Sequence, residues 1–252
     1  MALSPSDPAL ALRLELAREL AARAGAIQRE RFETGLSIET KSATIDLVTE
    51  VDRACEALIA DGLRAHLPAD AILAEEGHGD EDGDGAFRWV IDPLDGTTNF
   101  AHGFPRFCVS IGVERRGERA IGVVYDPLLD ERFEAALGEG AWLGTRRLRV
   151  SQESELGRSL IATGFAYDVH HSDEDNLESF RNVVKTARGI RRDGSAALDL
   201  CYVAAGFLMV EEAGGRLSDL RGGPGDPSGK EVVSSNGAVH EALLAQLVPT
   251  TP

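Results

Sequence analysis

Four oxygen donors lie close together in one short stretch of this chain, WVIDPLDGTTNF, and their types and spacing suit a metal ion. Residues 86–91 have strand character, Pro93 cannot donate to a strand ladder, and Gly96 permits a sharp turn. The donors therefore leave a strand end together: the Asp92 carboxylate, the Leu94 carbonyl, the Asp95 carboxylate and the Thr97 hydroxyl. Hard oxygen ligands favour a hard divalent cation, Mg²⁺ first. Taken alone, the same stretch could also be an Asx-type turn held by hydrogen bonds.

Three further acidic residues stand where they could complete such a pocket. Glu75 and Glu76 follow directly on a predicted strand, as Asp92 follows on its own, so Glu75 would face the cation if the two strands are neighbours. Asp46 precedes a predicted helix. A Glu-Glu pair is commonly exposed and an Asp before a helix is commonly a cap, so each signal is weak by itself. Their order along the chain favours a common site.

Helical and strand patterns indicate the elements that must position these groups. An amphipathic helix is predicted from Pro8, and a second one from a capping box formed by Thr49 and Asp52. The middle of the chain predicts a mostly antiparallel sheet, with strands at residues 71–74, 86–91, 109–114, 119–125, 132–136 and 148–150. The later part alternates, with strands at 160–163, 189–192 and 216–218 and helices at 177–187, from 195 and at 239–247. We expect two halves, an N-terminal α+β half (1–150) with the metal-binding motifs and a C-terminal α/β half (151–252) with substrate contacts.

Bulk composition narrows the class of protein. The 252 residues, 43% of them hydrophobic, can bury a proper core. Forty-two acidic against 26 basic residues give a formal charge of −16, which disfavours nucleic acid and anionic lipid as partners and requires a cation beside any anionic substrate. The three cysteines form no paired spacing, which argues against a disulfide framework and a zinc site. With no apolar run of signal or membrane-span length, we expect a cytoplasmic protein.

The motifs, taken in order, resemble the inositol monophosphatase family. The resemblance rests on DLVT from Asp46, EE at Glu75, DPLDGTTNF from Asp92, GSAALD from Gly194 and EAGG from Glu212. It implies a layered α/β/α/β/α sandwich of the sugar-phosphatase type, and a Mg²⁺-dependent, lithium-sensitive phosphatase that forms a homodimer and acts on a small phosphorylated metabolite. An inositol monophosphate is the leading substrate.

The resemblance also implies a role for each matching residue. Metal ligands would be Glu75, Asp92, the Leu94 carbonyl and Asp95, with Asp92 bridging two ions. Catalytic residues would be Asp46, Thr97 and Glu75, with the Thr97 hydroxyl and Asp46 positioning the attacking water. Substrate contacts would come from Gly96, Thr97, Gly194, Ser195 and Ala196, whose backbone amides can receive phosphate or hydroxyl oxygens. Plain helix initiation remains open for Gly194 and Ser195.

One departure from the family pattern limits the second metal site. Between the helix that starts near Ser195 and the EAGG motif, the family has a strand with a substrate-contacting acidic residue and then a Trp-Asp pair whose Asp is a metal ligand. This chain passes directly from Gly206 to Phe207, and its two tryptophans lie elsewhere. Asp199 falls inside the preceding helix and cannot replace the missing ligand. Either the protein is naturally shortened or the sequence omits a segment of the native chain; we favour the second.

Two further interpretations stay open. Relatives with the same metal cradle cleave fructose 1,6-bisphosphate, histidinol phosphate, NADP or 3′-phosphoadenosine nucleotides, and the residues that separate these substrates lie largely in the absent segment and nearby loops. Alternatively, the chain is a catalytically silent member that acts as a binding partner. The absent metal ligand favours this alternative, whereas the presence of Thr97 and Asp46 disfavours it.

Overall fold

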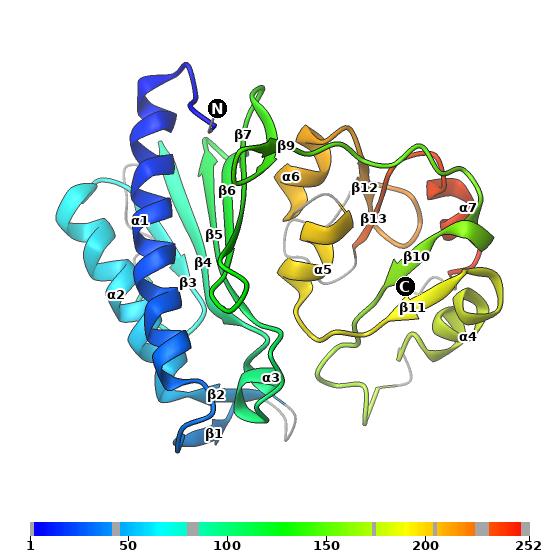
Figure 1. Cartoon of the computed structure of the whole chain (residues 1–252), viewed down its shortest axis with the longest axis horizontal. Helices are drawn as coiled ribbons and strands as arrows, with labels where there is room; N and C mark the ends of the chain where they lie inside the picture. The colour runs from blue at the N-terminus through cyan, green and yellow to red at the C-terminus, as the bar shows by residue number, and fades with distance from the viewer. Residues whose placement is uncertain are drawn as a thin grey trace.

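The structure is a computed structural model that describes residues 3–41, 46–79, 86–172, 175–203, 206–224 and 232–247. Its first layer consists of two helices that cover one face of a large sheet (Figure 1). Helix α1 (Pro8–Arg31) begins at Asp7, whose side chain accepts a hydrogen bond from the Ala9 amide. Helix α2 (Glu50–His66) begins with the predicted capping box, in which Thr49 and Asp52 satisfy each other's backbone amides. Both predicted helix starts are therefore confirmed.

The second layer is a seven-stranded sheet with the order β3-β4-β5-β6-β7-β8-β9. Its strands are β3 (Ala71–Ala74), β4 (Phe87–Asp95), β5 (Cys108–Arg115), β6 (Glu118–Asp126), β7 (Glu131–Ala136), β8 (Gly140–Leu143) and β9 (Arg146–Arg147). Only the β3–β4 pair is parallel, which agrees with the predicted, mostly antiparallel sheet. Fully buried Leu14, Ile59 and Trp89 fill the core between this sheet and the two helices.

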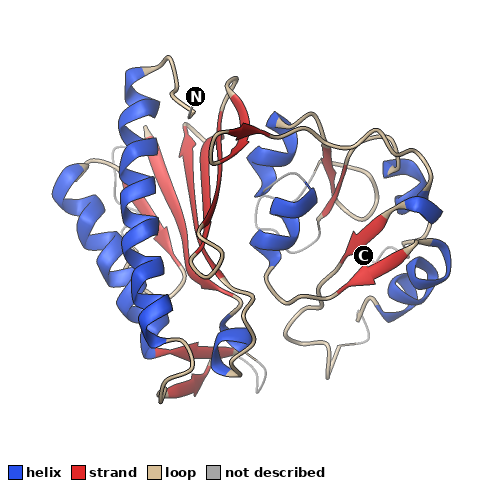
Figure 2. Ribbon diagram, viewed as in Figure 1, coloured by secondary structure: helices blue, strands red, loops and turns tan. Residues whose placement is uncertain are grey.

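The opposite face of the sheet carries a middle helical layer (Figure 2). Helices α5 (Ala196–Val203) and α6 (Gly206–Glu212) pack there through a second core that includes Phe133, Leu198 and Met209. This layer brings the C-terminal half of the chain against the strand ends of the N-terminal half.

The fourth and fifth layers are smaller. Strand β10 (Leu160–Ala162) pairs in parallel with β11 (Gly189–Arg191), and β12 (Arg216–Ser218) pairs antiparallel with β13 (Val233–Ser235). Helices α4 (Leu177–Thr186) and α7 (His240–Leu244) lie outside them (Figure 1). The predicted order of layers, α/β/α/β/α, is confirmed. Within the described residues, however, the second β layer consists of two separate pairs of strands.

Short elements account for the differences from the sequence prediction. Residues 148–150, predicted as a strand, form none; instead the Val150 amide bonds the Ala213 carbonyl at 3.2 Å, at the end of α6. The pattern did not predict the strands β1 (Ile38–Thr40), β2 (Leu47–Thr49), β8, β9 and β13, the helix α3 (Thr97–Ala101) or the 3-10 turn at Leu156–Arg158. Elements this short hold too few residues to show a period, so tertiary pairing decides them.

Further predictions concern the boundary between the two halves of the chain and the presence of membrane-spanning helices. The predicted boundary at residue 150 falls between β9 and the 3-10 turn, where the chain crosses from the large sheet to the outer layers. Among the described residues, no helix combines the length and apolar character that crossing a bilayer requires. Cys55, Cys108 and Cys201 are all buried and unpaired.

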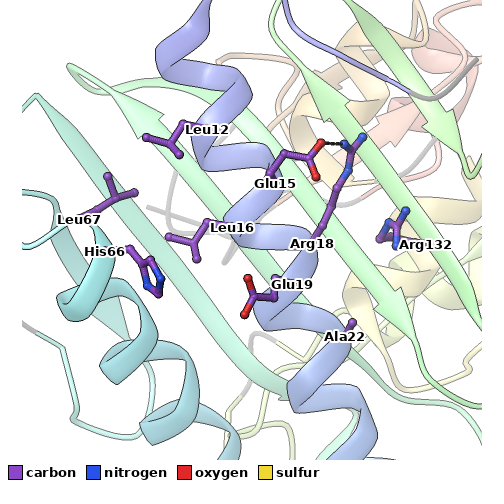
Figure 3. Close-up of a pocket in the computed structure, with 9 residues that line it drawn as sticks. All are labelled: Leu12, Glu15, Leu16, Arg18, Glu19, Ala22, His66, Leu67 and Arg132. Carbon is purple, nitrogen blue, oxygen red and sulfur yellow. Dashed lines mark hydrogen bonds and ion pairs between the residues drawn. The ribbon is translucent and has the colours of Figure 1, made fainter.

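A groove of about 640 Å³ lies on the outer side of α1 (Figure 3). It is lined by Leu12, Glu15, Leu16, Arg18, Glu19, Ala22, His66, Leu67 and Arg132. None of the predicted site residues lines it, so the chemistry indicated by the sequence belongs elsewhere.

Candidate active site

Residues 92–97, here called the carboxylate turn, lie where β4 leaves the sheet and α3 begins. The register between β4 and β5 shifts within this turn, as expected from Pro93. Gln28 of α1 donates its side-chain amide to the Pro93 carbonyl at 2.8 Å and so ties the turn to the first layer. Gly96 has φ of 98°, and a Cβ there would lie 2.8 Å from the Arg106 carbonyl. The predicted sharp turn therefore requires glycine at this position.

Glu75 reaches the same edge of the sheet from the neighbouring strand. Strand β3 is parallel to β4, with Ala74 opposite Ile91, so Glu75 and Asp92 are the next residues in register. The prediction that these two strands are neighbours is confirmed. Backbone positions beyond Glu75 are held by the fully buried Glu56 of α2, which accepts the amides of Glu76 and His78 at 2.5 and 2.8 Å.

The electrostatics of the carboxylate turn favour a cation. Burial raises the pKa of Asp92 well above its ordinary value, and the charges of Asp95 and Glu75 raise it further. Burial likewise raises the pKa of Asp95, although hydrogen bonds from the start of α5 oppose this effect. Half-buried carboxylates that cannot readily ionise side by side form an oxygen-rich donor set that a divalent cation stabilises. The residues of the turn therefore fit a hard metal ion.

The carboxylate of Glu75 binds another partner and does not join Asp92 and Asp95 in a metal site. Its carboxylate pairs with the Lys41 ammonium at 2.8 Å, and Lys41 also pairs with Glu76. Across the part of the chain that the structure describes, no three acidic, histidine or cysteine side chains are close enough together to hold a metal ion as they stand. A lysine thus supplies the positive charge beside Glu75.

The Thr97 hydroxyl has a carboxylate partner that the sequence reasoning did not identify. It lies 2.9 Å from Asp52 Oδ1 and 2.9 Å from the Leu94 carbonyl. Asp52 is almost fully buried, and its second oxygen accepts the Thr49 amide at 2.8 Å and the Thr49 hydroxyl at 2.6 Å. Burial raises the pKa of Asp52, against these hydrogen bonds. The capping box was the visible signal, but it indicated only a helix start.

Asp46, predicted as the partner of Thr97, is also buried, and its carbonyl accepts the Lys41 amide at 2.8 Å. Residues 42–45 lie outside the described part of the chain. We assign the partnership with Thr97 to Asp52 on geometry, and a catalytic role for Asp46 stays a prediction.

The start of α5 binds the carboxylate turn directly. The Ser195 hydroxyl donates to Asp95 Oδ2, and the amides of Ala196 and Ala197 donate to Asp95 at 3.2 and 2.9 Å. Asp95 therefore stabilises the N-terminus of the helix, where backbone amides favour a negative charge. Helix initiation, the alternative left open for Gly194 and Ser195, is confirmed by α5, and the contact of Ser195 and Ala196 with Asp95 was not predicted. Substrate binding by Gly194, Ser195 and Ala196 stays a prediction.

The Asn99 side chain connects α3 to the segment that precedes α5. Its side-chain amide donates to the carbonyls of Arg106 and Asp193, each at 2.7 Å. Gly194 follows with φ of 81°, and a Cβ there would lie 3.1 Å from the Asn99 side chain. Asn99 therefore sets how closely the segment before α5 approaches α3. In the sequence, Asn99 is visible only as a member of the DPLDGTTNF motif, and its contact with the segment before α5 was not predicted.

The amides of Gly96 and Thr97, predicted to receive phosphate oxygens, stand at the start of α3. The first amides of a helix have no partner within it, and a phosphate site at this turn would use them; phosphate binding by Gly96 and Thr97 stays a prediction. Asp199 lies inside α5, as expected, and burial followed by the neighbouring charge of Asp193 raises its pKa to about 6.

Comparisons with known proteins agree with this geometry. Residues 10–210 match the family model described as the inositol monophosphatase family. An inositol-1-monophosphatase of Synechocystis is 40% identical over 98% of this chain and 92% of its own length. A Nus factor SuhB of Pseudomonas aeruginosa is 44% identical over 86% of this chain and 88% of its own. The solved structure of an inositol monophosphatase from Anabaena covers 93% of this chain and 94% of its own, with a TM-score of 0.82 and 36% identity.

The Synechocystis alignment bears on the absent segment. It spans 265 positions, more than the 252 residues of this chain, so the relative carries residues that this chain lacks. An alignment length does not place those residues along the chain, so the departure between Gly206 and Phe207 stays a prediction.

Proposed function

Since the chain belongs to the inositol monophosphatase family, we propose that it is a Mg²⁺-dependent phosphatase that hydrolyses the phosphate monoester of a small polyol, with an inositol monophosphate as the leading substrate. The observation that carries the proposal is the Thr97 hydroxyl, held between Asp52 and the Leu94 carbonyl beside the half-buried pair Asp92 and Asp95.

Four oxygen donors would hold the metal: the carboxylates of Glu75, Asp92 and Asp95 and the carbonyl of Leu94. When bound, Mg²⁺ supplies charge that neutralises phosphoryl oxygens and lowers the pKa of water. Hydrolysis of phosphate monoesters is among the slowest uncatalysed reactions, with enzymatic accelerations up to about 10²¹-fold, so side chains alone are insufficient. The −16 charge of the chain likewise requires a cation beside an anionic substrate.

Asp52 and Thr97 position the attacking water. Asp52 accepts a hydrogen bond from the Thr97 hydroxyl. The lone pairs of the Thr97 oxygen are then free to accept a hydrogen bond from the water. The Leu94 carbonyl competes for the same Thr97 proton. If Leu94 turns its carbonyl to a metal, the hydroxyl pairs with Asp52 alone. The water is then oriented by a hydroxyl whose own partner is a buried carboxylate.

Substrate contacts are proposed at two helix starts. The amides of Gly96 and Thr97 would receive phosphate oxygens, and the segment from Gly194 to Ala196 would receive a hydroxyl of the polyol. Proximity supports the second group, because Ser195 and Ala196 already touch Asp95.

A phosphate-release panel tests the proposal. Inositol monophosphate, fructose 1,6-bisphosphate, histidinol phosphate, NADP and a 3′-phosphoadenosine nucleotide are assayed with and without Mg²⁺, beside the Asp92→Asn variant. We expect release from inositol monophosphate to require both Mg²⁺ and Asp92. Phosphate release that is unaffected by omission of Mg²⁺ and by Asp92→Asn would refute the metal-dependent mechanism. Faster release from another compound of the panel would identify that compound as the substrate.

A second candidate is a catalytically silent member that acts as a binding partner. The pairing of Glu75 with Lys41 and the absent metal-ligand Asp favour it, and one relative is named as a Nus factor. Absence of turnover across the whole panel, in a protein that binds Mg²⁺, would support this candidate.

We further propose that the protein works in the cytoplasm as a homodimer that lithium inhibits. Three buried, unpaired thiols support a reducing compartment, while the dimer and the lithium inhibition rest on family membership. Light scattering on the purified protein measures whether it is a dimer. A lithium titration of phosphate release measures the inhibition.

A further inference from the structure

We infer that Lys41 is an internal counter-cation that holds Glu75 in the metal-free protein and competes with the metal ion for it. This inference rests on the proposed metal dependence, and it adds a residue outside the set of metal ligands. Lys41 donates to Glu75 at 2.8 Å and pairs with Glu76 as well. Across the described residues it is the one basic side chain paired with any of Glu75, Asp92 or Asp95.

The backbone holds both partners in place. Lys41 directly follows β1, which pairs with β2 through Ile38 and Thr49 at one end and Thr40 and Leu47 at the other. The Lys41 amide then bonds the Asp46 carbonyl at 2.8 Å, which closes the base of the connection between these strands. On the other side, Glu56 fixes the backbone after Glu75. The ion pair therefore depends on side-chain rotation at Glu75 and Lys41, which can reverse without refolding.

A lysine at this position has the right chemistry for an exchangeable cation. The chain contains three lysines among its 26 basic residues, and arginine serves at the other positions. An ammonium is a compact, strongly hydrated point charge without the fork that fixes arginine to a carboxylate. It can therefore neutralise Glu75 in place of a metal and leave into water when a divalent ion arrives.

Competition follows from charge. An ammonium and a divalent cation repel each other at the same carboxylate, so metal binding at Glu75 requires Lys41 to leave. The absence of a three-ligand metal cluster among the described residues fits this account, because Glu75 is turned to Lys41. Removal of the ammonium should therefore raise metal affinity, although it takes a partner from Glu75 in the metal-free state.

The matched control is Arg53. It lies on α2 and feels the charges of Glu76 and Asp52, but its guanidinium pairs with Glu39 at 2.6 and 3.0 Å. Arg53→Gln thus removes the same charge near the same cluster without touching Glu75. A general field effect would act in both variants, whereas direct competition acts only in Lys41→Gln.

The test is Mn²⁺ binding to the full chain without substrate, followed through the electron paramagnetic resonance signal of the free ion. We expect Lys41→Gln to lower the Kd about tenfold, Lys41→Arg to raise it, because the guanidinium fork holds Glu75 more firmly, and Arg53→Gln to stay within about threefold of wild type. An unchanged or higher Kd for Lys41→Gln, or an equal decrease for Arg53→Gln, overturns the inference. No Mn²⁺ binding by the wild type would instead overturn the proposed metal dependence.

A measurement on the wild type covers the case in which the variants fold poorly. Amine acylation, quantified by mass spectrometry, compares Lys41 with Lys185 on α4, which reports the general reactivity of lysine in the same sample. We expect saturating Mn²⁺ to accelerate acylation of Lys41 at least threefold and to leave Lys185 unchanged. Equal rates at Lys41 with and without a bound ion would show that Lys41 does not leave Glu75.

Discussion

The Thr97 hydroxyl lies 2.9 Å from a carboxylate oxygen of Asp52, although 45 residues separate the two in sequence. Asp52 thereby has two tasks, because its other oxygen completes the capping box of α2. The start of a structural helix is thus connected directly to the residue that we propose as the water-positioning hydroxyl.

Asp52→Asn tests that connection. We expect kcat to fall about 10²-fold or more, since Asn lacks the negative charge and keeps one acceptor oxygen, whereas Asp52 uses one oxygen for Thr97 and the other for Thr49. In a Thr97→Ala background the same change should cost little more, because the pair acts as a unit. Steady-state phosphate release measures both. Asp46→Asn is the informative comparison: a larger loss there than in Asp52→Asn would return the role to Asp46.

Asn99→Ala should loosen the contact between the two halves of the site. Two hydrogen bonds to carbonyls are lost, at about 1 kcal/mol each, so we expect the free energy of unfolding to fall by about 2 kcal/mol. Displacement of the segment before α5 should lower kcat/KM at least about tenfold. Asn182→Ala serves as the control, because Asn182 bonds the Gln246 carbonyl at 3.2 Å and touches no site residue. Equal effects on kcat/KM in both variants would contradict the positioning role.

Asp70→Ala should be the most destabilising of these changes. Asp70 accepts hydrogen bonds from Nε and Nη2 of buried Arg13, at 2.8 and 2.7 Å, and from the Trp89 indole at 2.8 Å. Its loss leaves the buried Arg13 charge without a carboxylate partner, although the Ala9 carbonyl still accepts from it, and breaking a buried ion pair costs about 3–5 kcal/mol. Urea denaturation measures the difference. The exposed pair of Arg64 and Asp61 gives the control, since Asp61→Ala should change stability by less than about 0.5 kcal/mol.

His240 should make the protein less stable in acid. It is fully buried between the hydroxyls of Ser218 and Ser235, at 2.8 and 2.9 Å, and burial together with Arg216 lowers its pKa below 6.5. The unfolded chain then binds the proton more readily, so this stability is present above pH 6.5 and is lost as pH falls below it. Denaturation at pH 5 and pH 8 should show a smaller difference in His240→Gln than in the wild type. An identical pH dependence in both proteins would disprove the assignment.

The absent metal-ligand Asp gives a prediction about the polypeptide itself. A verified 252-residue chain should bind a second metal ion weakly and turn over substrate very slowly. Asp199 lies within α5 and cannot replace the missing metal-ligand Asp. Titration of bound metal per chain and kcat measure the two effects. Normal Mg²⁺-dependent activity from that chain would refute the prediction, and an intact mass of the native protein above 26.9 kDa would show that a segment is omitted.

Some features of the site could be predicted from the sequence because their causes are local. Pro93 and Gly96 dictate the carboxylate turn through backbone chemistry, and the Thr49 and Asp52 capping box acts over three residues. Strands β4 to β7 of the large sheet are long enough to show their pattern, whereas β8 and β9 are not. The relatives confirmed the family that the ordered motifs resemble.

Only the tertiary structure decided which distant groups touch. The pairing of Thr97 with Asp52, of Ser195 with Asp95 and of Lys41 with Glu75 spans 45, 100 and 34 residues. Such contacts depend on how helices pack across the sheet and where connecting loops end, and no periodicity along the chain records either. A residue's type and local spacing therefore determine the chemistry available to this protein, while packing determines which partner receives each proton or charge.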